Sequence, residues 1–118
     1  MSCIDSEFAC GLDLGTTFSC IGVYRNGGVE IIPNTNEEKT TPSIVTVLDE
    51  NTFLIGEEAL DNLVKNYDST IFDVKRFIGK DFTDQDVKDR IKFENYPFKI
   101  IKNDKNINEI EINRNKKS

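Results

Sequence analysis

Three short apolar runs separated by turn signals occupy the start of the chain, and they constrain its fold more than any other feature. They span Phe8–Leu14, Phe18–Tyr24 and Val29–Ile32. The Asn-Gly-Gly sequence at 26–28 is typical of a tight β-hairpin turn. An antiparallel meander of three strands is therefore predicted over the first 32 residues. The first strand is expected to be buried on both faces, because its apolar run is bounded by turn residues and is nearly continuous.

A polar stretch bounded by prolines follows at residues 33–43 and is predicted to be a loop or crossover. Ile44–Leu48 and Thr52–Ile55 then form a second predicted hairpin. Beyond it, the apolar residues at positions 59, 60, 63 and 64 recur with the spacing of one helical face. This change of period predicts a helix after the second hairpin.

A second helix is predicted over Thr70–Ile78. Ser69 or Thr70 is expected to cap its start, and Gly79 is expected to end it in a left-handed conformation.

A third helix is predicted to open with a pattern resembling a capping box at Thr83–Asp86, with Val87 and Ile91 on one face. The chain is then expected to finish with two strands, Tyr96–Ile101 and Glu109–Asn113, joined by a polar turn. The predicted fold class is therefore α/β in the mixed, α+β sense: a β-meander followed by a small α/β unit.

Composition narrows the classes of function. The chain has 118 residues, of which 37% are hydrophobic, so it is long enough for one domain. Residues 1–98 carry 9 basic and 18 acidic side chains, whereas residues 99–118 carry 6 basic and 3 acidic. The acidic body argues against a nucleic-acid module, which needs a basic surface to neutralise phosphates. No apolar run is long enough to span a membrane, and the basic cluster at 114–118 is interpreted as a solvated tail.

Histidine is absent, which excludes histidine-based catalysis and zinc sites with histidine ligands. The three cysteines, Cys3, Cys10 and Cys20, form no CxxC pattern and are odd in number, so no disulfide framework is expected. Cys10 and Cys20 lie in apolar stretches and are predicted to be small buried side chains. The first residues resemble no secretory signal, so a cytoplasmic protein is expected, with the nucleus as the alternative.

The sequence Asp13-Leu14-Gly15-Thr16-Thr17 carries the strongest chemical signal. An aspartate in an apolar strand is costly unless its charge is paired or binds a cation. Two interpretations are open. In the structural one, Asp13 accepts backbone N–H bonds from the following turn. In the functional one, Gly15 lets backbone N–H groups approach phosphate oxygens, and the two threonines add hydroxyl donors. Asp13 would then face the accompanying magnesium through water. The motif is not a Walker A loop.

Lys75 is the second candidate, within Phe72-Asp73-Val74-Lys75-Arg76-Phe77-Ile78-Gly79. A lone lysine on a helix is ordinarily solvated. Here its apolar neighbours predict a packed segment, and a lysine at the edge of such a segment can line a cleft. There its ammonium would offset the charge that develops on a transferring phosphate. Spacing alone does not decide between these two roles.

Four segments together resemble the amino-terminal part of the 70-kilodalton heat-shock protein family. They are GLDLGTTFSCIGVYRNGGVEIIPN, TTPSIV, LIGEEA and FDVKRFIGK. The match runs from about Phe8 to the final strands near Asn113, with order and spacing in agreement. The chain is most similar to the eukaryotic cytosolic and endoplasmic-reticulum types, and the absence of a signal peptide favours the cytosol.

This resemblance implies a partial actin-like, ribonuclease-H-like ATPase fold whose first hairpin binds the phosphates of ATP or ADP. The residues that match the phosphate-binding hairpin are Gly15, Thr16, Thr17 and Phe18. By the same match, Asp13 would contact the shell of a magnesium ion. Lys75 corresponds to the family lysine that acts at the γ-phosphate and the attacking water. Phe18 replaces the commoner tyrosine, which leaves the backbone contact intact.

The resemblance also implies a function: the amino-terminal part of an ATP-dependent molecular chaperone that serves protein folding and the stress response. Residues 1–43 would supply the first strands of an ATPase lobe, 44–113 its small subdomain and 114–118 a basic tail. Expected partners are ATP, co-chaperones, exchange factors and unfolded client proteins. The family's second phosphate loop is not in this sequence, so weak ATPase activity is expected from these residues alone. A non-enzymatic interaction module and an inactive gene fragment are the alternatives.

Overall fold

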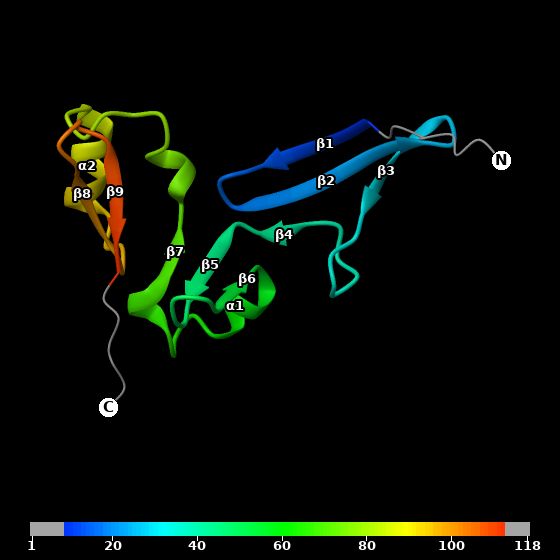
Figure 1. The fold of residues 1–118 in the computed structure, drawn as a ribbon, viewed down its shortest axis with the longest axis horizontal. Coiled ribbons are helices and arrows are strands. Elements are labelled where there is room, and N and C mark those ends of the chain that lie inside the picture. The colour runs from blue at the N-terminus through cyan, green and yellow to red at the C-terminus, as the bar shows by residue number, and fades with distance from the viewer. Residues whose placement is uncertain (1–8, 113–118) are drawn as a thin grey trace.

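The computed structural model describes residues 9–112, and its first sheet is an antiparallel meander. β1 (Ala9–Leu14) pairs with β2 (Phe18–Arg25), and β2 pairs with β3 (Gly28–Ile32). Figure 1 shows β1 and β2 as the two long arms of one hairpin. The turn between β2 and β3 has positive φ at both positions 26 and 27, as an Asn-Gly turn of this kind requires. The predicted meander is confirmed.

The polar stretch after β3 contains a strand that the sequence analysis missed. β4 (Thr41–Pro42) pairs with the first two residues of β2, Phe18 and Ser19. A proline at such an edge is tolerated because its missing N–H faces away from the ladder. This short strand brings the end of the predicted loop against the start of β2.

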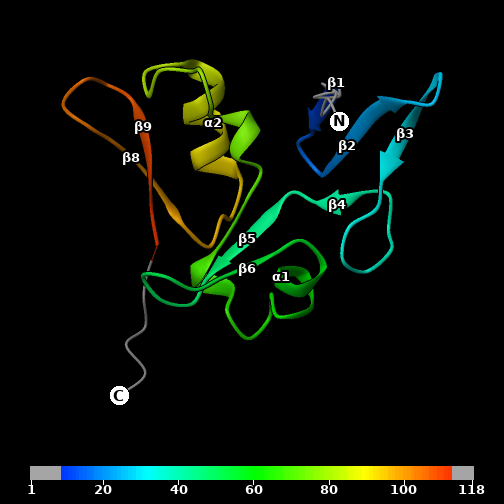
Figure 2. The ribbon, with the colours of Figure 1, turned by 45° about the vertical axis from the view of Figure 1, so that its right-hand side comes forward.

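The second sheet has the strand order β6-β5-β7, and both pairs are antiparallel. β5 (Ile44–Val47) and β6 (Phe53–Ile55) form the second predicted hairpin. Helix α1 (Glu57–Asp61) lies beside them and buries Ala59 completely, as Figure 2 shows.

The helix predicted from the apolar spacing at 59–64 is shorter than expected. It ends at Asp61, and Val64 is 94% exposed. Asn62 explains the early end, because its side-chain amide donates to the Glu58 carbonyl over 2.8 Å and competes with continuation of the helix.

The helix predicted over 70–78 is wrong. The 3₁₀ turn η1 (Tyr67–Ser69) leads into β7 (Thr70–Phe72), and a second 3₁₀ turn, η2 (Val74–Arg76), follows. β7 pairs with β5, and the hydroxyl oxygens of Thr46 and Thr70 lie 2.8 Å apart in the interior. β-branched residues fit such a pleated surface, and the ladder with β5 overrides the helical spacing. Gly79 does have the predicted left-handed conformation, with φ 73°.

A third unit follows the two sheets and consists of a helix packed against a hairpin. α2 (Gln85–Phe93) lies beside β8 (Lys99–Lys102) and β9 (Asn108–Glu111), as Figure 2 shows. The buried cluster of this unit consists of Phe77, Val87, Phe98 and Ile100. The third helix and the final hairpin are therefore confirmed. Asn113, the predicted end of the last strand, and the tail at 114–118 lie outside the described residues.

The start of α2 differs from the predicted capping box. Asp84, not Thr83, occupies the cap, and its carboxylate accepts the backbone N–H of Asp86 over 2.9 Å. Aspartate is the stronger cap because its carboxylate is charged and lies at the positive end of the helix.

The first strand is not buried as predicted. All six residues of β1 are exposed, and Leu12 is 68% exposed. Cys10 is exposed and Cys20 is only half-buried, so their predicted burial is also wrong. The reason is that, within residues 9–112, α1 lies beside β5 and β6 and α2 lies beside β8 and β9, so neither helix covers the meander (Figures 1 and 2). The fold class is confirmed as mixed α/β with mostly antiparallel strands.

Val87 should be a stability determinant of the third unit, because its side chain is fully buried. We expect Val87→Ala to lower the free energy of unfolding by about 1.5–3 kcal/mol, through lost burial and an unfilled cavity. Val64→Ala is the matched control, since that side chain is exposed, and it should change stability by less than about 0.5 kcal/mol. Urea denaturation of both variants tests this. Equal losses in the two variants would show that α2 does not pack as described.

Candidate functional site

The turn between β1 and β2 needs glycine at its first position. Leu14 and Ser19 form the last pair of the hairpin ladder, so residues 15–17 and the start of β2 make the turn. A Cβ added at Gly15 would lie closer than 3.0 Å to the carbonyl oxygen of Phe18. That oxygen belongs to the backbone, so it yields only if the turn changes shape. Glycine is therefore required at this position because the backbone of Gly15 lies close to the Phe18 carbonyl, which leaves no room for a side chain.

Ser43 holds this turn from the neighbouring segment, and the sequence analysis did not single it out. Its N–H donates to the Thr17 carbonyl over 2.8 Å. Its hydroxyl donates to the Gly15 carbonyl over 2.8 Å, and its Oγ lies 2.8 Å from the Ser19 Oγ. The one available signal was a serine directly after a proline in an extended stretch, which is too common a pattern to identify such a contact.

The turn offers hydrogen-bond donors that the described part of the chain leaves unused. Thr16 is half-buried and Thr17 is exposed, and neither hydroxyl forms a hydrogen bond within residues 9–112. Among the residues described, the backbone bonds outside the regular ladders include none from the Thr16 N–H. Phe18, at the start of β2, is 53% exposed. Successive donors in a turn of this kind form a concave site that suits an anion.

Asp13 lies one residue before the last ladder pair and is opposite Cys20. Its side chain is exposed and has neither an ion pair nor a side-chain hydrogen bond among the residues described. The structural interpretation, in which Asp13 accepts N–H bonds from the next turn, therefore finds no support. A solvated carboxylate at this edge is chemically suited to the water shell of Mg²⁺.

Lys75 lies in η2, not in the helix predicted for it, and its side chain is exposed. No ion pair involves it within the described chain. Both ribbon views place η2 beside the β1–β2 turn (Figures 1 and 2). The fold thus brings the segment that carries Lys75 next to the segment that carries Gly15 and Thr16, although about 60 residues separate them in the chain.

Asp73 anchors the backbone just before Lys75. It has a left-handed conformation, with φ 58°, which is uncommon for a residue other than glycine. Its carboxylate accepts the Tyr96 hydroxyl over 3.3 Å and pairs with the Arg76 guanidinium at 3.5 Å. Burial, followed by the nearby Asp73 charge, raises the pKa of the Tyr96 phenol above its usual value of 10.0. Tyr96 therefore stays protonated and can donate to Asp73 at neutral pH.

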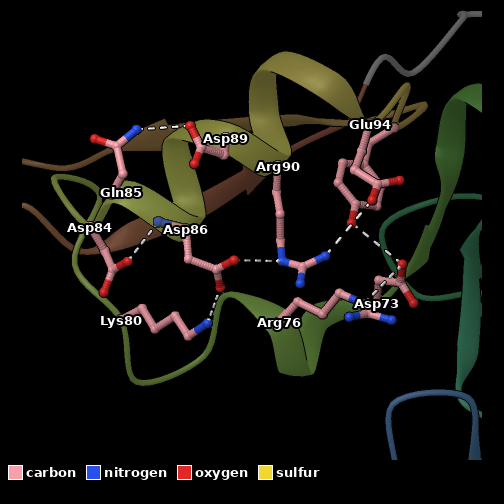
Figure 3. A network of polar contacts seen from close by, with 10 residues as sticks. Asp73, Arg76, Lys80, Asp84, Gln85, Asp86, Asp89, Arg90 and Glu94 are labelled. Atoms are coloured by element: carbon pink, nitrogen blue, oxygen red, sulfur yellow. Dashed lines mark hydrogen bonds and ion pairs between the residues drawn. The ribbon is translucent and has the colours of Figure 1, made fainter.

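A second polar group fixes the loop between η2 and α2. Figure 3 shows Asp86 between Lys80 and Arg90, with which it forms ion pairs. The hydrogen bond from Lys80 is the main cause that lowers the pKa of the Asp86 carboxyl. These charges pair with one another on the surface of the third unit, and we interpret the network as structural. Within residues 9–112 no three acidic or cysteine side chains are close enough to hold a metal ion by themselves.

The fold and the turn together define a class of protein: a mixed α/β unit consistent with part of an actin-like ATPase lobe. The sequence model of the Hsp70 protein family matches residues 9–118, and the chain therefore belongs to the Hsp70 family. Membership confirms the resemblance on which the expected chaperone class and ATP binding were based. The individual roles of Asp13, Lys75 and the turn residues remain predictions. Among the residues described, no helix is both long and apolar enough to cross a membrane.

Gly15 offers a direct test of the turn geometry. We expect Gly15→Ala to lower the free energy of unfolding by about 1–3 kcal/mol, because the new Cβ would overlap the Phe18 carbonyl. Gly11→Ala is the matched control, since a Cβ at that β1 position meets nothing within 4 Å. Thermal unfolding of both variants, with amide NMR of residues 14–19, makes the comparison. The described turn is incorrect if Gly15→Ala leaves the unfolding midpoint and these amide signals unchanged.

Proposed function

We propose that the β1–β2 turn binds the phosphates of Mg·ATP or Mg·ADP, and that the chain serves as the amino-terminal part of an ATP-dependent Hsp70 chaperone. One observation carries the proposal: the turn is held in shape from outside by Ser43, while the hydroxyls of Thr16 and Thr17 have no hydrogen-bond partner among the residues that the structure describes. A turn that is already held in shape and has unused donors needs little reorganisation to bind an anion, so the free-energy cost of binding is small. Membership in the Hsp70 family supplies ATP as the candidate anion.

The donor set fits phosphate better than other anions. The turn carries two threonine hydroxyls and backbone N–H groups in consecutive residues, so it offers several donors to an anion that has several oxygens, as a phosphate does. Phe18 contributes its backbone to the turn, since its side chain has no polar group.

Asp13 is the residue that would hold magnesium, through water, and the ion would neutralise phosphate charge when bound. The fit rests on the carboxylate being exposed and without an ion pair in the described chain. Mg²⁺ commonly uses one or two carboxylates together with waters and phosphates, so a single aspartate beside a phosphate turn is a suitable partner.

Lys75 would act in hydrolysis rather than in binding. Its segment lies beside the turn, and its ammonium has no ion-pair partner among the described residues. A cation near the γ-phosphate stabilises the charge that develops there as water attacks. Asp73 and Tyr96 would hold the backbone from which this lysine extends.

The second candidate function is a non-enzymatic interaction module. The observation that favours it is the uncovered meander, on which Leu12 and Val29 are both more than half exposed. Co-chaperones, exchange factors and unfolded clients are the partners expected for the family. We propose a cytoplasmic location, with the nucleus as the alternative.

A titration of the ¹⁵N-labelled chain tests nucleotide binding. We expect Mg·ATP to shift the amide signals of Thr16, Thr17 and Phe18 more than those of β8 and β9, because the donors are in the turn. Adenosine lacks phosphates and should leave the turn signals in place. Equal shifts with adenosine, or shifts confined to other segments, would contradict the proposed phosphate site and favour the interaction module.

Lys75 is best tested in a chimaeric Hsp70 ATPase domain that begins with these residues. We expect Lys75→Ala to slow single-turnover hydrolysis by roughly 10²–10³-fold, because losing a group that stabilises developing charge costs about that much. ATP affinity should change only a few-fold, since the lysine contributes little to the ground state. Lys65→Ala, which removes another exposed lysine, is the control and should leave both quantities unchanged. Hydrolysis at the parent rate by Lys75→Ala would show that this lysine is merely solvated.

A further inference from the structure

The hydroxyl of Ser43 has only one arrangement that satisfies both of its neighbours. It carries a single hydrogen, which is donated to the Gly15 carbonyl over 2.8 Å. The contact of 2.8 Å between the Ser43 and Ser19 oxygens must then be donated by Ser19. The two serines therefore form a directed chain, from the Ser19 hydroxyl through the Ser43 hydroxyl to the Gly15 carbonyl. A chain of this kind strengthens each of its bonds.

These bonds determine where two peptide groups of the turn point. In a trans peptide the C=O and the following N–H point in opposite directions, and the chain contains no cis peptide among its described residues. The Gly15 carbonyl points at Ser43, so the Thr16 N–H points away from it. The Thr17 carbonyl also points at Ser43, so the Phe18 N–H is likewise directed away.

Ser43 is itself held by the second sheet. It lies between β4 and β5, and both of its chain neighbours, Pro42 and Ile44, are buried. Gly56 donates its N–H to the Ile44 carbonyl over 3.1 Å. A Cβ at Gly56 would lie 2.6 Å from the Thr41 side chain, so the two segments are in close contact. Ser43 thus lies at the junction of the two sheets, because β5 begins directly after it and the two residues before it pair with β2.

We propose that Ser43 is a positioning residue for phosphate binding: anchored in the second sheet, it orients the Thr16 and Phe18 N–H groups toward the nucleotide. This rests on the proposed function, because it names the residue that prepares the same site. Ser43 does not touch the phosphates. It keeps the Gly15 and Thr17 carbonyl oxygens away from them, and those oxygens would otherwise repel an anion.

Ser43→Ala removes the hydroxyl bonds and keeps the backbone N–H bond to Thr17. The Gly15 peptide then becomes free to rotate, so we expect the affinity for Mg·ATP to fall by about tenfold, as the loss of one hydrogen bond in a preorganised site predicts. Ser43→Thr keeps the hydroxyl and should restore binding. Ser69→Ala removes a serine that bonds a carbonyl of another segment, Asn66, and should bind like the parent.

The test is an NMR titration of the full 118-residue chain with Mg·ATP, with heteronuclear NOE values of the turn amides recorded before ligand is added. The expected result is tenfold weaker binding and larger fast motion at residues 15–17 in Ser43→Ala, with both reversed in Ser43→Thr. A parent-like affinity in Ser43→Ala overturns the proposal. So does an equal loss in Ser69→Ala, because that would be a general effect on stability.

Failure of the proposed function is a separate outcome. If the parent chain binds no Mg·ATP, phosphate binding by these residues is rejected. The role of Ser43 in orienting the turn is then tested only by the heteronuclear NOE values at residues 15–17. Unchanged order at residues 15–17 in Ser43→Ala then overturns the positioning role as well. If Ser43→Ala does not fold, Ser43→Cys replaces it: the thiol has nearly the same shape but is a weak donor, so it should loosen the turn and weaken binding in the same way.

Discussion

The crossing of the chain from the meander to the second sheet, at Thr41–Ser43, is the contact on which the rest of the structure depends. Over three residues the chain pairs with the start of β2, holds the β1–β2 turn and leads into β5. The proline within it has a restricted φ, so the direction of the crossing is defined locally. The meander and the small α/β unit are thereby joined beside the turn and not at the far ends of the strands, as Figure 1 shows.

The aromatic cluster of the third unit holds the segment that carries Lys75, as Thr41–Ser43 holds the β1–β2 turn. Tyr96 stacks on Phe98 with ring centroids 5.1 Å apart and meets Phe77 edge-on at 5.4 Å. Its hydroxyl reaches out of the cluster to Asp73, two residues before Lys75. Ring packing thus determines where η2 sits, and the hydrogen bond determines the backbone conformation from which the lysine emerges.

Local patterns predicted the elements whose stabilisation is local. The Asn-Gly turn, the final hairpin and α2 were all recoverable, since turn chemistry and capping act within a few residues. The strand at Thr70–Phe72 could not be predicted from local sequence. Its residues suit a helix or a strand, and the choice depends on pairing with β5, which lies more than 20 residues earlier. The exposure of β1 was missed for a similar reason: a continuous apolar run indicates burial without showing what covers it.

By itself, the sequence determined the chemistry available to this protein. It specified a glycine-threonine turn beside an aspartate, a distant lysine, no histidine and a family match over nearly the whole chain. Only the tertiary structure decided which residues cooperate. Ser43 became part of the candidate site because a two-residue strand pairs with β2, and η2 came to lie beside the turn because β7 pairs with β5. Such contacts depend on strand pairings between distant segments, whose free energy comes from many residues at once, so no short motif encodes them.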